Sequence, residues 1–171
     1  MMLNFNTPPA VGWDDPIDML YACHGKVKNF CRQLRILPGY LQTKGINQAV
    51  KNDVRQILTY FNHSAPLHHE DEEQDFFPAL LSYRPDVQPD IDALERQHLD
   101  LHQNWARLSA QLEALLHDDC VQVDPALIDT FIAAYDSHIA REEPLFELGK
   151  QQLSAAELQA MGKIMAARRK R

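Results

Sequence analysis

The sequence predicts an all-α protein: an antiparallel up-down four-helix bundle with a short fifth helix at its C-terminal end. Two features of the composition favour helices. Leu and Ala together number 39 against 20 for Val, Ile and Thr combined, and Gly is scarce, with 6 among 171 residues. The third observation is that apolar residues recur at spacings of three and four, which places them on one stripe of a helix.

Charge and cysteine content exclude several classes of protein. With 17 Lys and Arg against 24 Asp and Glu, the net charge of −7 argues against nucleic acid as a partner, and the length suits one domain. The first 13 residues carry neither a basic leader nor a long apolar stretch, so we expect no signal peptide and no membrane span. We therefore expect a cytoplasmic protein, and three cysteines without a CxxC pair indicate reduced thiols.

Residues 16–149 are expected to form the bundle, preceded by an N-terminal arm of residues 1–15. The first helix begins at Pro16, because Asp15 can cap it and proline suits the first helical position. Pro38-Gly39 is expected to end this helix. Its inward stripe consists of Ile17, Leu20, His24, Val27, Cys31 and Leu34.

The second helix is predicted to be long and interrupted. It begins near Asn47. Pro66 removes one backbone donor, which predicts a kink or a short break just before His68-His69, and Pro78 tightens or ends the last turns. The inward stripe of this helix consists of Val50, Val54, Ile57, Phe61, Ala65, His69, Glu73 and Phe76.

The remaining helices follow two connecting segments. The loop at residues 83–89 leads into a third helix, and Asp124-Pro125 starts a fourth that stops at Gly149. Residues 150–171 form the fifth helix, opened by a capping box, with a basic end that we expect to be solvated. The stripes are Ile91, Leu94, His98, Leu101, His102, Trp105, Leu108, Leu112 and Leu115 in the third helix, and Ile128, Phe131, Tyr135, His138, Glu142 and Leu145 in the fourth.

Each of the four bundle helices carries at least one histidine on its inward stripe, and two carry a glutamate there as well. Burying these groups without partners would cost several kcal/mol each, and a bound metal removes that cost. Residues four apart on a helix lie about 6 Å apart on the same side, so such pairs can bind one centre. The candidate metal ligands are His24, His69, Glu73, His98, His102, His138 and Glu142.

A weak internal repeat chooses between neighbouring glutamates. Residues 69–77 align without a gap on residues 138–146, and in both segments a Glu follows the His by four and an aromatic residue follows the Glu by four. The repeat favours Glu73 in the second helix and Glu142 in the fourth. Glu143 remains an alternative, since an error of one residue in the fourth helix is allowed.

Two neighbours of these residues are expected outside the ligand set. His68 is rotated by about 100° from His69, which predicts a position at the surface or behind the ligands. The repeat also favours Glu73 over Glu72. The outward members of the acidic run at residues 70–75 are expected to solvate the helix.

Seven nitrogen and oxygen donors without a thiolate suit two metal ions better than a single zinc. We expect two iron ions. Two octahedral irons offer about twelve positions, and two bridging carboxylates, five imidazoles and an oxo or hydroxo bridge leave one of them open. A small ligand such as O2, nitric oxide or peroxide could occupy that position.

This set of motifs resembles the hemerythrin family, in particular the bacterial hemerythrin-like domains with a His-His-Glu cation-binding signature. The resemblance covers roughly residues 16–148. The segments that carry it are Ala22-Cys23-His24, residues 68–78, His98-x-x-x-His102, and His138-x-x-x-Glu142-Glu143-x-Leu145-Phe146.

The resemblance also implies roles for the candidate ligands. His24 and His69 would bind one iron, the three remaining histidines would bind the other, and Glu73 and Glu142 would bridge the two. Oxygen-carrying hemerythrins have an aspartate five residues after the histidine of the fourth helix. This chain has Glu at four and at five, which follows the hemerythrin-like pattern and argues against oxygen transport.

Three functions are compatible with these observations. The favoured hypothesis is a non-enzymatic, metal-binding protein whose di-iron centre takes up O2 or NO for storage, sensing or iron handling. The alternative is a di-iron enzyme acting on nitric oxide or peroxide, or in iron–sulfur cluster repair. A metal-free helical interaction module is the least favoured, since it leaves five inward histidines unexplained. Either a monomer or a homodimer is expected.

Overall fold

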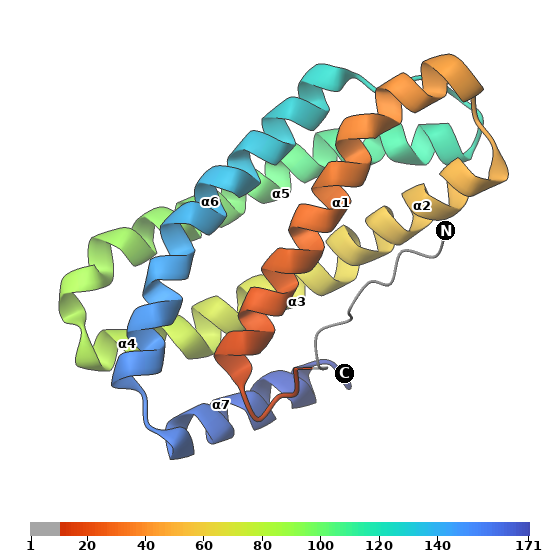
Figure 1. Ribbon diagram of the computed structural model, residues 1–171. Coiled ribbons are helices and arrows are strands. Elements are labelled where there is room, and N and C mark those ends of the chain that lie inside the picture. The colour runs from red at the N-terminus through yellow and green to blue at the C-terminus, as the bar shows by residue number, and fades with distance from the viewer. Residues whose placement is uncertain (1–10) are drawn as a thin grey trace, which may run out of the picture.

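The computed structural model describes residues 11–171, and helices account for nearly all of this part of the chain (Figure 1). No strand occurs among these residues, so the all-α prediction is confirmed. Residues 1–10 of the predicted N-terminal arm lie outside the described part. The long helices are α1 (Pro16–Lys44), α5 (Gln88–Leu116) and α6 (Pro125–Gln152), and the shorter α7 (Ala155–Arg168) follows them.

The second helix of the bundle is continuous over residues 48–83, but two π-helical turns interrupt its α-helical geometry. Each of its two π-helical turns, η1 and η2, is followed at the second position by a proline, Pro66 or Pro78. Proline lacks an N–H and its ring clashes with the carbonyl four residues earlier, and a wider π turn accommodates both effects. The segments are α2 (Gln48–Thr59), η1 (Tyr60–Ser64), α3 (Ala65–Asp71), η2 (Glu72–Phe76) and α4 (Phe77–Tyr83), and the 3₁₀ turn η3 (Pro85–Val87) leads on to α5.

The end of α1 differs from the prediction. The helix continues through Pro38 to Lys44, because Leu37 and Leu41 on either side of the proline are both buried in the core. The helix ends at Gly45, which has a φ of 68° and whose N–H donates to the carbonyl of Leu41. Glycine adopts this left-handed conformation at no steric cost, which explains why the helix stops there.

Two apolar clusters fill the bundle, one towards each end. The larger cluster packs residues such as Leu34, Phe61 and Phe131, and the smaller one packs Phe76 and Phe146 among others. Buried polar side chains lie between the two clusters along every helical arm, as His24 lies between Leu20 and Val27 on α1. The bundle therefore contains a polar layer enclosed by apolar packing on both sides.

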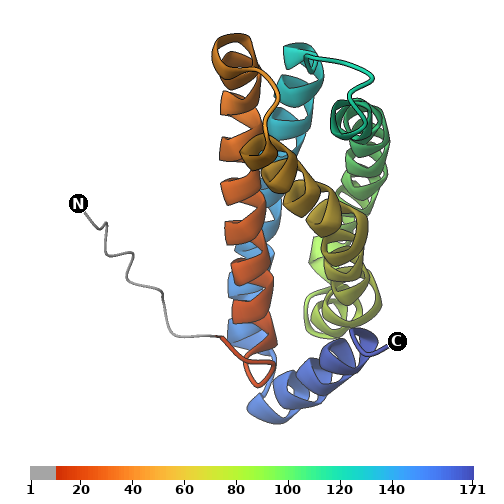
Figure 2. The same cartoon turned by 90° about the vertical axis from the view of Figure 1, so that its right-hand side faces the viewer.

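Helix α7 crosses one end of the bundle, beside the start of α1 (Figure 2). It opens with the predicted capping box, in which Ser154 and Glu157 satisfy each other's backbone N–H groups. The expectation of a solvated basic end was wrong for Arg168, which is buried at 7% exposure and packs towards η2. Among the described residues, no helix is both long enough and apolar enough to span a bilayer.

Candidate metal centre

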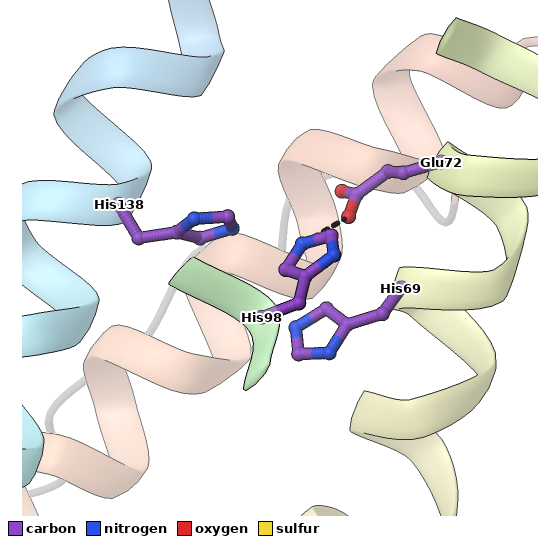
Figure 3. Close-up of side chains that lie close together, drawn as sticks. All are labelled: His69, Glu72, His98 and His138. Carbon is purple, nitrogen blue, oxygen red and sulfur yellow. Dashed lines mark ion pairs between the residues drawn. The ribbon is translucent and has the colours of Figure 1, made fainter. Parts of the chain in front are cut away.

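The polar layer contains two groups of four potential metal ligands that share one carboxylate. In each group the ligand atoms all lie within 4.8 Å of one another, and every residue is buried. Figure 3 shows the second group, in which side chains from three helical arms point toward one another. The first group is His24, His68, Glu72 and Glu142, and the second group is His69, Glu72, His98 and His138.

The position of Glu72 follows from the geometry of α3. At about 100° per residue, Glu72 lies about 40° around the helix from His68 and therefore between His68 and His69. Both histidines are 3% exposed and face the bundle interior. Glu73 lies about 40° beyond His69, at the margin of this face. Since His68 faces inward, the carboxylate central to the face is Glu72 and not Glu73.

Each buried carboxylate contacts both groups. Glu72 Oε1 lies 2.7 Å from His68 Nε2, and Glu72 Oε2 lies 3.3 Å from His98 Nε2. Glu142 Oε2 lies 3.0 Å from His24 Nε2 and 3.3 Å from His138 Nε2. Each of these carboxylates is therefore placed where it could ligate two ions at once.

Unpaired polar atoms concentrate in this layer. Among the described residues, nine buried side-chain nitrogen or oxygen atoms lack a hydrogen-bond partner, and eight of them belong to residues of the two groups. His68 Nε2 and Glu72 Oε1, for example, are close but not aligned as donor and acceptor. Buried atoms without partners are costly, and imidazole and carboxylate donors suit metals such as iron or zinc. The residues present therefore fit bound metal ions.

Four of the five buried histidines have a polar partner on the ring nitrogen that faces away from the centre. A carboxylate or amide oxygen that accepts from Nδ1 fixes the proton there and leaves Nε2 free to bind a metal. The Nδ1 contacts are His24 with Glu143 at 3.2 Å, His98 with Glu73 at 2.6 Å, His138 with Gln97 at 3.1 Å, and His69 with His102 Nε2 at 3.1 Å.

Glu73 and His102, both predicted as ligands, lie outside the two groups. Glu73 is 40% exposed and contacts the outer nitrogen of His98. His102 is exposed because it lies at the edge of the inward face of α5, and it contacts the outer nitrogen of His69. The alternative Glu143 is likewise an outer partner. Each of these three residues contacts the outer ring nitrogen of a buried histidine and can fix the orientation of that ring.

Five of the seven predicted ligands lie in the two groups, and two members of the groups were missed. His68 and Glu72 were expected elsewhere, but His68-x-x-x-Glu72-x-x-x-Phe76 has the same spacing as the segment one residue later. The internal repeat therefore fits either register. Glu72 also follows both adjacent histidines by one turn, which is the signal that could have identified it. The residues brought together as predicted are His24, His69, His98, His138 and Glu142.

The carboxylate of Glu142 and the imidazole of His69 hold protonation states that suit metal binding. Burial raises the pKa of Glu142, but the adjacent imidazoles of His138 and His24 outweigh burial and hold the pKa well below its usual range. Burial lowers the pKa of His69 well below its usual value, and the neighbouring His98 lowers this pKa further. A carboxylate that stays ionised and an imidazole that stays neutral are the forms that bind metals.

Metal affinity should increase with pH because His98 holds a proton in the metal-free protein. Burial lowers the pKa of His98, but the neighbouring carboxylates of Glu72 and Glu73 outweigh burial and raise the pKa to about 9. A metal at Nε2 displaces this proton, so the affinity should rise about tenfold per pH unit from pH 7 to 9. Calorimetric titration with Zn²⁺ in two buffers of different ionisation enthalpy measures both the affinity and the protons released.

The contribution of His98 to folding has the opposite sign. Because its pKa is raised in the folded state, His98 stabilises the metal-free fold fully below its unfolded pKa near 6.5 and loses this effect as the pH rises through about 9.

The variant Glu73→Gln removes one charged partner of His98 and should flatten the pH dependence of metal affinity. An affinity that does not change between pH 7 and 9 would contradict a protonated His98.

Comparison with known proteins agrees with this geometry. A bacterial protein from Haemophilus influenzae (strain ATCC 51907 / DSM 11121 / KW20 / Rd), described as an uncharacterized protein, is 60% identical over 157 residues, which cover 92% of this chain and 91% of that protein. The sequence profile of the Hemerythrin HHE cation binding domain matches residues 15–148, the stretch that contains all members of the two groups. The chain therefore belongs to the family of hemerythrin HHE cation-binding domains.

Proposed function

We propose that the protein binds two iron ions in the polar layer and uses this centre to bind O2 or a similar small ligand such as NO. The observation that carries the proposal is the placement of Glu72 and Glu142. Each carboxylate lies against a histidine of both groups, which suits a pair of metal ions better than two separate ones. The family assignment supports cation binding in general.

The proposed ligand set differs from the sequence prediction in two residues. His68 takes the place of His102, and Glu72 takes the place of Glu73. The number of donors stays at five imidazoles and two carboxylates, so the expected donor atoms are unchanged. Under this proposal His24 and His68 hold one ion, and His69, His98 and His138 hold the other, with Glu72 and Glu142 shared.

The surroundings of the layer favour reversible ligand binding over oxidation of a substrate. When bound, iron supplies redox chemistry and a coordination position for a small ligand. A histidine-rich set donates less negative charge than a carboxylate-rich one and stabilises high oxidation states less. The apolar clusters on both sides, which include Phe76, Phe146 and Phe131, limit the access of water to the layer.

The proposal places the protein in the cytoplasm. Cys23, Cys31 and Cys120 are all free thiols, and thiols persist in a reducing compartment. Reducing conditions also keep iron in the ferrous form that binds O2 and NO. Whether the chain acts as a monomer or as a homodimer does not affect the centre, since every proposed ligand comes from one chain.

Metal analysis combined with visible spectroscopy tests the proposal. Protein purified in air should contain two irons per chain and show a visible charge-transfer band. Anaerobic reduction should bleach this band, and re-exposure to O2 or addition of NO should produce a new spectrum that reverses when the ligand is removed. A chain that takes up no metal even after anaerobic loading with Fe²⁺ would contradict the proposal. Sustained oxidation of an organic substrate would favour an enzyme instead.

A further inference from the structure

The C-terminal end of α7 contacts the turn that carries the shared carboxylate. Arg168, the last residue of α7, pairs with Asp71 and lies 2.8 Å from Asp75 Oδ2 through Nη2. The same guanidinium donates to Gln74 Oε1 at 3.3 Å and lies 3.5 Å from Glu70 Oε2. One buried arginine therefore contacts residues on both sides of Glu72 and Glu73.

Arg169 adds a second set of contacts to the same segment. Its guanidinium contacts both carboxylate oxygens of Asp71, at 2.6 and 3.1 Å, and donates to the carbonyl of Met165 at 2.9 Å. The guanidinium also lies over the ring of Trp13, 4.2 Å from its centroid. Asp71 is fully buried between the two arginines, so its orientation is fixed by ion pairs and not by solvent.

These contacts fall where the helix is least regular. Asp71 is the last residue of α3 and Glu72 is the first residue of η2. A π turn contains an extra residue and is rare, so it needs support from its surroundings. Asp71 faces α7 while Glu72 faces the centre, and any rotation of the backbone here would move both side chains together.

From this arrangement we propose that Arg168 and Arg169 are positioning residues, which fix η2 through Asp71 and thereby aim Glu72 at the metal centre. The proposal rests on the proposed function for its effect on metal binding, while the effect on η2 does not require a metal. Arginine suits this role because its planar fork reaches several carboxylates at once, which lysine cannot do. The basic end of the chain is thus part of the metal centre's support.

The test compares Arg168→Lys with a matched variant of α7. Lysine keeps the charge opposite the buried Asp71 but loses the fork. Met161→Ala removes a buried apolar side chain from the same helix, two turns from Arg168. This substitution leaves the contacts between the two arginines and η2 in place. Both variants should have a lower melting temperature than the wild-type protein. Each protein is therefore measured at the same number of degrees below its own melting temperature, which separates a general loss of stability from a local one.

Amide hydrogen exchange of the metal-free full chain supplies the first measurement. Arg168→Lys should increase exchange at residues 72–77 about tenfold relative to α5, and Met161→Ala should not. Titration with Co²⁺ supplies the second measurement: Arg168→Lys should bind about tenfold more weakly and show a changed absorption spectrum at saturation. Equal exchange patterns in the two variants would overturn the proposal, as would an unchanged Co²⁺ affinity and spectrum.

Two further outcomes have a defined meaning. If Arg168→Lys fails to fold, the variant Arg168→Met with Asp71→Leu removes both buried charges of the pair, and it should fold while showing the same local increase in exchange. If the wild-type protein binds no Co²⁺, Zn²⁺ or Fe²⁺, the proposed function fails. The exchange measurement then still supports or overturns the fixing of η2 by the arginines.

Discussion

Replacing Glu72 by Gln should remove the second metal ion and weaken the binding of the first more than about 100-fold. The amide keeps the size of the side chain but loses the negative charge and one of the two oxygens that contact His68 and His98. This loss should exceed the 10- to 100-fold effect typical of residues that only support a ligand. Metal analysis after gel filtration, together with anaerobic Fe²⁺ titration, measures both quantities.

The matched control is Glu73→Gln, the same substitution one residue later. Glu73 contacts the outer nitrogen of His98 and is partly exposed. This variant should therefore keep two metal ions per chain, with an affinity reduced within about 10- to 100-fold. If Glu73→Gln lost a metal ion and Glu72→Gln kept both, the register predicted from the internal repeat would be the functional one.

Removing the metal ions should lower the melting temperature by about 10 to 20 °C. Without metal, the polar layer contains eight buried atoms that have no hydrogen-bond partner. A ligand present at 100 times its Kd stabilises the fold by about 2.7 kcal/mol per site, or about 5 kcal/mol for two sites. For a chain of this size, 1 kcal/mol shifts the melting temperature by about 2–4 °C. Calorimetry or circular dichroism with and without a chelator measures the shift.

A variant without the central ligands provides the control for this shift. His68→Leu combined with Glu72→Leu replaces a buried polar pair by apolar side chains, which bundles often tolerate or gain from. This double variant should fold, and its melting temperature should respond to metal less than that of the wild-type protein, because the three histidines of the second group remain. A wild-type protein whose melting temperature does not respond to chelation or to added metal would show that the layer is stable on its own, and would remove the main energetic reason for a metal centre.

The bundle could be predicted from the sequence because its signal is repeated many times. Stripes of apolar residues on four helices and the capping box at Ser154 all indicate the same fold, and an error at one position changes little. Local effects were harder to predict. Pro38 was expected to end the first helix, but the buried leucines at 37 and 41 hold the chain helical until Gly45.

The choice of ligands depends on rotations of single residues, which the sequence pattern does not resolve. His68 and His69 differ by about 100°, and the sequence alone suggests that one of them faces outward. In the folded protein the polar layer is wide enough to take both, and this places Glu72 between them instead of Glu73. His102 similarly lies only about 40° around α5 from His98, yet His98 is buried and His102 is exposed.

The sequence by itself determined the helical bundle, the burial of histidines and glutamates on its inner faces, and the type of donor available to a metal. Only the tertiary structure decided which carboxylate lies between the two groups and that the buried arginine of α7 contacts the turn beside it. The physical reason is that helix periodicity averages over many residues, whereas the membership of the two groups depends on two π turns, on the edges of helix faces and on contacts between segments nearly 100 residues apart.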